Sequence, residues 1–109
     1  YPLLSLRAEA LWLDHQYEAA SKILTQLTRK RNQDPMIWYR LAEVRGLAGN
    51  ISGVHEARAE YFILVAAFSL AREQLNLALG LVKHDFKRSA VYRQRLREVI
   101  EMEEKAERL

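Results

Sequence analysis

The chain of 109 residues contains no cysteine, only two prolines and only four glycines. Without cysteine it can form neither a disulfide framework nor a thiolate zinc site, and its redox compartment stays undetermined. The longest apolar run, residues 61–68, is far shorter than the roughly 20 residues of a membrane-spanning helix. Few breakers and no alternating β-branched runs leave little support for strands. These absences favour an all-α protein.

Half of the residues are apolar and 28% are charged, which is the composition of a folded globular protein. The length suits a single domain spanning 1–109. The net charge of +3 comes from 17 basic and 14 acidic residues that are mixed along most of the chain. Nucleic-acid binding requires a concentrated basic face. We therefore expect no nucleic-acid partner. Because the apolar runs are short, we also expect no direct membrane insertion.

The opening YPLLSLRAEALWL has neither an initiator Met nor a signal-peptide layout, so we expect a fragment of a longer protein.

Apolar residues at three- and four-residue steps predict six helices joined by short turns. The expected spans are residues 3–13, 17–31, 34–48, 52–65, 69–82 and 86–100. Asp34, Ser52 and Asp85 are the expected N-caps of the third, fourth and sixth helices. Gly49 can adopt the left-handed backbone that closes the third. Beyond Met102 the apolar stripe is thin, so we expect the end of the last helix to fray.

The helices repeat with a period of 34 residues, because a shift of that length carries Leu4 onto Trp38 and Ala8 onto Ala42. This is the period of the tetratricopeptide repeat, in which small residues let paired helices approach closely. Ala8, Ala20 and Ala42 are the expected spacers. The spacing predicts a right-handed superhelix of antiparallel helix pairs.

We divide the chain into a first repeat at 1–34, a second at 35–67, and a third helix pair with a long C-terminal helix at 68–109. The second repeat is degenerate, because Arg45 occupies an expected apolar position. The third pair matches the first after a shift of 51 residues, which is one and a half repeats. The fourth helix therefore serves twice, contributing Ala59 and Phe62 to the next unit.

In this architecture the first helix of each pair lines a concave groove. Trp12 and Tyr39 would act there as aromatic anchors. Trp12 could equally be a core residue or be covered by another domain, whereas we interpret Trp38 as core. The expected contact residues are Ser5, Glu9, Trp12 and Leu13, followed by Met36, Tyr39, Glu43, Gly46 and Leu47.

The last helix carries a run of basic residues with no acid between them, followed directly by glutamates. It could dock an acidic partner or another domain, or it could simply be a solvated face. The run consists of Lys87, Arg88, Arg93, Arg95 and Arg97.

The segment GNISGVHEARAEYFILVAAFSLAREQLNLAL at 49–79, followed by HDFKRSAVYRQRLREV, resembles a known family. This is the C-terminal tetratricopeptide domain of the periplasmic zinc metalloproteases that assist outer-membrane β-barrel assembly in Gram-negative bacteria. The shared features are the HxARAEY helix at 55–61, the QLxxAL segment at 74–79 and the final arginine-rich helix. The resemblance implies a periplasmic scaffold that binds client polypeptides or partners and adjoins an N-terminal protease domain.

Catalysis in that family belongs to a His-Glu-x-x-His zinc motif in the N-terminal domain, and this chain has none. No two of His15, His55 and His84 stand four residues apart, the spacing that places two imidazoles on one metal. We therefore expect no catalytic, metal or cofactor residue in this chain. The alternative function is a cytoplasmic adaptor or assembly chaperone with the same fold and no linked protease.

Overall fold

The computed structural model describes residues 2–109, with side chains from residue 3 onward, and all regular secondary structure in this part of the chain is helical. The prediction of an all-α fold with six helices is confirmed. The helices are α1 (Pro2–Leu13), α2 (Tyr17–Lys30), α3 (Pro35–Leu47), α4 (Ile51–Leu64), α5 (Phe68–Leu81) and α6 (Phe86–Glu107).

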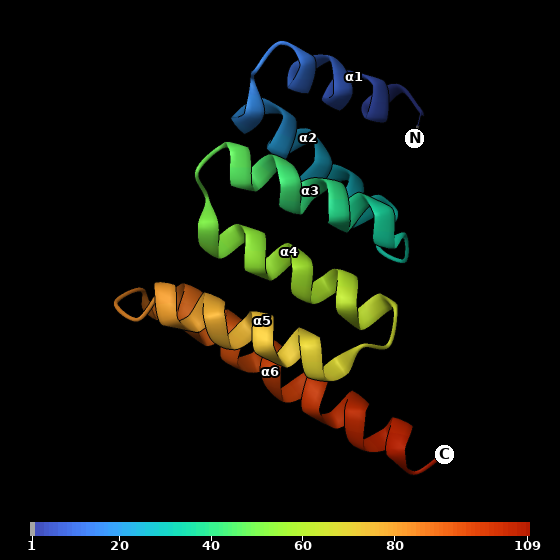
Figure 1. Ribbon diagram of the computed structural model, residues 1–109, viewed down its shortest axis with the longest axis vertical. Coiled ribbons are helices and arrows are strands. Elements are labelled where there is room, and N and C mark those ends of the chain that lie inside the picture. Colours follow the sequence, from blue (N-terminus) through green and yellow to red (C-terminus); the bar gives the residue numbers. More distant parts are fainter. Residues whose placement is uncertain (1) are drawn as a thin grey trace.

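The helices are stacked along the long axis of the molecule, and each packs against the next in sequence (Figure 1). The Cα extents are 45 × 35 × 18 Å, so the array is about two helices thick. Helix α4 lies between α3 and α5, while α2 and α6 lie behind this row. The row is therefore covered from behind near its two ends.

Three of the turns have the same geometry. The turns after α1, α3 and α4 each contain one residue with a left-handed backbone, His15 (φ 60°), Gly49 (φ 83°) and Ala66 (φ 60°). In each, the following amide donates to the carbonyl five residues back, as Gln16 does to Leu11 at 2.8 Å. This is the Schellman motif. Only Gly49 was predicted, because glycine alone reveals such a turn in a sequence.

Carboxylate caps start two helices at the predicted residues. Asp34 Oδ1 accepts from the amide of Met36 at 3.0 Å, and Asp85 Oδ1 accepts from that of Arg88 at 3.1 Å. The predicted cap at Ser52 is wrong. Asn50 caps α4 by accepting from the Gly53 amide at 3.1 Å, because the Schellman turn ends there and the helix begins one residue later.

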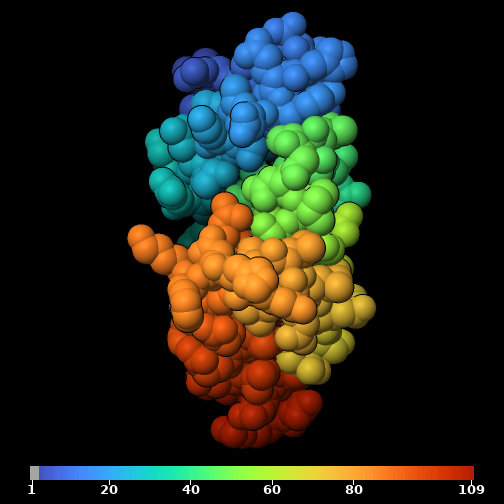
Figure 2. Space-filling view, turned by 90° about the vertical axis from the view of Figure 1, so that its left-hand side faces the viewer, coloured from blue at the N-terminus to red at the C-terminus, as the bar shows by residue number. Residues whose placement is uncertain are grey.

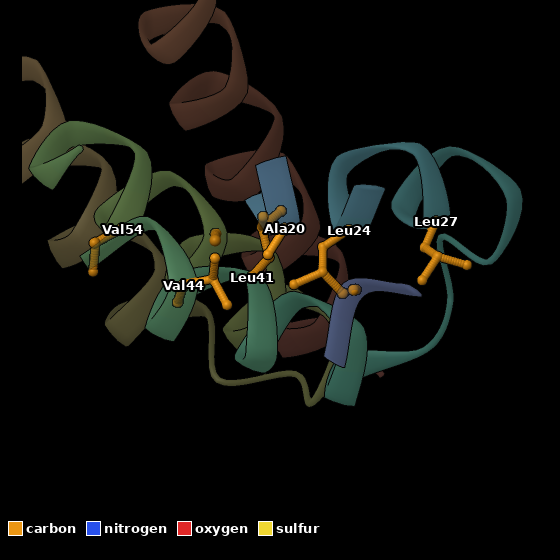
Figure 3. Packing of buried hydrophobic residues seen from close by; sticks show 9 residues of the cluster. Ala20, Leu24, Leu27, Leu41, Val44 and Val54 are labelled. Carbon is orange, nitrogen blue, oxygen red and sulfur yellow. The ribbon is translucent and has the colours of Figure 1, made fainter. Parts of the chain in front are cut away.

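The interior consists of one large apolar cluster in the first half and two smaller ones in the second. The labelled side chains of the first form a band from Leu27 on α2 to Val54 on α4 (Figure 3). The three predicted spacer alanines are buried in this cluster, as small residues between packed helices should be. They are Ala8, Ala20 and Ala42.

Helix α4 contributes to clusters on both of its sides. Val54 and Ala57 lie in the first cluster, whereas Ala59 and Phe62, the two residues singled out in the sequence, lie in the second with α5 and α6. A single helix thus joins the cores of the two halves.

The last helix is longer than expected, because it continues past Met102 to Glu107. Arg72 Nε on α5 lies 2.9 Å from Glu103 Oε1, so an ion pair holds this end where apolar contacts are few.

The helix boundaries of the first half recur in the second half, beginning with α4. Adding 51 to a residue number carries Tyr17, the start of α2, onto Phe68, the start of α5, and Pro35, the start of α3, onto Phe86, the start of α6. The α1 end at Leu13 falls on Leu64, the end of α4. The chain can therefore be divided into two three-helix units, α1–α3 and α4–α6. Four of their six helix boundaries match after the shift, whereas α4 begins two residues earlier and α6 ends nine residues later than the shift requires.

Candidate interaction grooves

A groove of about 200 Å³ lies between α1 and α3, and we call it the α1–α3 groove. Leu24 and Leu27 of α2, which are buried, form its floor together with Ala8. The walls are polar and apolar in alternation, with Ser5, Glu9 and Trp12 on α1 and Met36, Ile37 and Arg40 on α3. Such a surface suits a partner segment with an apolar side chain flanked by polar groups.

Arg40 and Trp12 close one side of this groove. The guanidinium carbon of Arg40 lies 4.8 Å from the centroid of the Trp12 ring, within the range of a cation–π contact. Trp12 also packs on the first cluster, so its ring is both part of the core and part of the groove. The stacking fixes two side chains of the kinds that most often anchor protein interfaces.

Four residues predicted from the repeat line this groove, namely Ser5, Glu9, Trp12 and Met36. The others do not. Leu13 is 76% exposed at the end of α1, and the Tyr39 ring packs against Tyr61 of α4 with the centroids 5.7 Å apart. Glu43 and Leu47 are exposed on α3 away from the groove. Sequence reasoning missed Arg40, although it lies one turn after Met36 on the same helix face.

A second cavity, of about 650 Å³, lies between α2 and α6, and we call it the α2–α6 hollow. In Figure 2 it opens on the left, between the teal end of α2 and the orange α6. Trp38 of α3 and Leu75 of α5 line it, as do Thr25 and Thr28 of α2. Trp38, which we interpreted as core, is half-buried: it packs on the first cluster and also borders this hollow.

Two ion-pair groups lie at the base of the hollow. Arg45 Nη1 is 2.9 Å from Glu56 Oε1, and Arg95 binds both carboxylate oxygens of Glu60 at 2.8 and 2.9 Å. Arg95 also reaches Glu98 at 3.2 Å. The hydrogen bond to Glu60 raises the pKa of Arg95, so the guanidinium keeps its charge.

Tyr92, which borders the same hollow, is buried. Burial, with a smaller contribution from Glu56, raises the pKa of its phenol, which therefore stays neutral in ordinary buffers.

The predicted basic run on α6 does not form one unpaired face. Arg95 is paired as described, and Arg97 donates to Gln94 at 2.6 Å. Arg88 makes a longer contact with Asp85 at 3.7 Å. Lys87 and Arg93 form no ion pair with any described residue. The run is split because residues two and five apart on a helix point in different directions.

The three histidines lie apart. Nδ1 of His15 is 2.7 Å from the Tyr17 hydroxyl, Nδ1 of His55 is 2.7 Å from Gln74 Oε1, and His84 is exposed. Across residues 2–109 no three histidine, cysteine or acidic side chains gather closely enough to hold a metal ion. None of the helices described here has the length and apolar character needed to cross a membrane.

Comparison of the chain with protein-family models, with curated proteins and with solved structures gives no match. The family resemblance seen in the sequence therefore stays a prediction.

Proposed function

We propose that the chain is a protein–protein interaction module of the tetratricopeptide type, with no activity of its own, and that the α1–α3 groove binds client or partner polypeptides. One observation carries the proposal: four residues chosen from the sequence as contacts surround a single cavity. The floor is apolar, and Arg40 over Trp12 provides an anchor pair. The buried alanine spacers and the recurring turns favour a right-handed superhelix.

The parent protein, in this proposal, is a periplasmic zinc metalloprotease that takes part in outer-membrane protein assembly and quality control. This part rests on the HxARAEY and QLxxAL segments. The N-terminal protease domain of the same protein would be a further partner of the array. Fractionation of cells that produce the full-length protein tests the compartment, because recovery from the cytoplasm would favour the adaptor function.

Binding by the groove is tested with an array of peptides that cover the strands of an outer-membrane β-barrel protein. Met36→Glu places a charge in the groove and is expected to lower the affinity for the bound peptides about tenfold. This corresponds to the loss of one interface anchor, roughly 1.4 kcal/mol. Leu13→Glu is the matched control, because Leu13 is exposed on α1 outside the groove. Equal losses in both variants, or no binding by the wild-type chain, would contradict the proposal.

A further inference from the structure

Part of the lining of the α2–α6 hollow is equivalent to the lining of the α1–α3 groove, although α2 and α3 of the first unit also line the hollow. Adding 51 carries Glu9 of the groove onto Glu60 of the hollow, Leu24 onto Leu75, and Arg40 onto Val91. The two recesses are therefore partly equivalent in position. The second is about three times as large by volume, 650 against 200 Å³.

The hollow is surrounded by helices in the way that a further helix packed into the array would be. Helices α2 and α6 form its two sides, and α3 and α4 lie beneath it. The α2 wall is apolar in effect, because Thr25 and Thr28 donate their hydroxyls to backbone carbonyls of their own helix, at 2.8 and 2.6 Å. On the opposite wall Val91 is 58% exposed. An amphipathic helix could bury its apolar side chains between these walls.

The charges around the hollow indicate which charge its occupant should carry. The carboxylates of Glu56, Glu60 and Glu98 are already paired with Arg45 and Arg95. On the rim, by contrast, Arg29 makes no ion pair with any described residue. The unbalanced charge at this edge is positive.

A smaller cavity adjoins the hollow and shares Val91, Tyr92 and the ion pair of Arg45 with Glu56. Lys87 and Arg88 line this extension, beside the N-terminus of α4. Lys87 has no ion-pair partner among the described residues, and the Arg88 contact with Asp85 is long and exposed. Both ends of the recess thus attract acidic groups.

We infer that the α2–α6 hollow binds an amphipathic helix of a partner protein, with an apolar face toward Trp38 and Val91 and acidic residues toward Arg29 and Lys87. A nucleic acid is disfavoured, because Arg45 and Arg95 are already paired with glutamates, which leaves few cations in the hollow for a phosphate backbone. This second site does not depend on the function proposed for the α1–α3 groove.

The test uses the two tryptophans of the chain as separate reporters, since Trp38 borders the hollow and Trp12 the groove. The probe is a helical peptide of about 20 residues with a leucine face flanked by glutamates, long enough to hold its helix. The comparison peptide carries lysines in place of the glutamates. With Trp12→Phe in place, we expect the acidic peptide to shift Trp38 emission to shorter wavelength in a saturable manner.

Arg29→Glu is expected to weaken the acidic peptide about fivefold, the effect of one exposed ion pair lost. Arg93→Glu is the matched control and should stay within about twofold, because Arg93 is exposed on α6 but does not line the hollow. Unmoved Trp38 emission, equal binding of the lysine peptide, or an equal effect of Arg93→Glu would overturn the inference. So would sedimentation of the free chain as a dimer with Trp38 already covered, because the occupant would then be a second copy.

Discussion

The units α1–α3 and α4–α6 agree in most of their helix boundaries after a shift of 51 residues, and they share buried alanines at equivalent positions. Ala8 corresponds to Ala59 and Ala20 to Ala71, and all four are buried. Around these positions the units differ. Leu27 of the first corresponds to Ala78 of the second, so the first unit has the larger apolar residue in its core.

At one core position the second unit has an ion-paired residue where the first has an apolar one. Buried Val44 in α3 corresponds to Arg95 in α6, which binds Glu60 and Glu98. Small residues at equivalent positions thus set the spacing of the helices, whereas the residues around them can be apolar or ion-paired once that spacing is fixed. This freedom allows the partly equivalent recesses to differ in volume and charge.

Equivalent leucines of the two units should contribute equally to stability, and more than any other residue considered below. Leu24→Ala and Leu75→Ala remove equivalent buried side chains, and each should lower the free energy of unfolding by about 3 kcal/mol. Urea denaturation measures both, and Leu77→Ala, at 47% exposure on α5, is the control with little expected change. A much smaller loss for Leu75→Ala would mean that ion pairs rather than packing hold the second unit.

The sequence predicted what depends on local signals. Asp34-Pro35 marked the start of α3, and the alanine spacing located buried core positions. Arg40 and the α2–α6 hollow were not predicted, because a groove depends on how the helices are placed around it. Residues of the five helices α2 to α6 line the hollow, and Figure 1 shows α4 in the row with α3 and α5. Ala59 and Phe62 predicted that α4 contacts both halves, but not that five helices would enclose a recess.

The ion pairs of Arg95 should make a smaller contribution to stability. They occur only in the second unit, because Val44 stands at the equivalent position of the first. Arg95→Ala should cost about 1 kcal/mol, because Arg95 and Glu60 are only partly buried and water screens the pair. A double-mutant cycle with Glu60→Ala, measured by urea denaturation, should give a coupling energy of similar size. In the first unit Glu9→Ala, at the position equivalent to Glu60, should change stability little. A coupling energy near zero would show that the two units are held in the same way.

The turns after α1 and α4 should contribute least to the difference in stability between the units. They have the same backbone conformation but different residues, His15 and Ala66. Ala66 has φ 60°, which an L-residue adopts at a cost and glycine adopts freely. Ala66→Gly should therefore raise the free energy of unfolding by about 0.5 kcal/mol, after the greater flexibility of the unfolded chain is subtracted. His15→Gly relieves the same strain but loses the 2.7 Å contact with the Tyr17 hydroxyl, so its gain should be smaller. Thermal unfolding of the two variants side by side measures the difference, and a larger gain for His15→Gly would show that this contact does not stabilise the first turn.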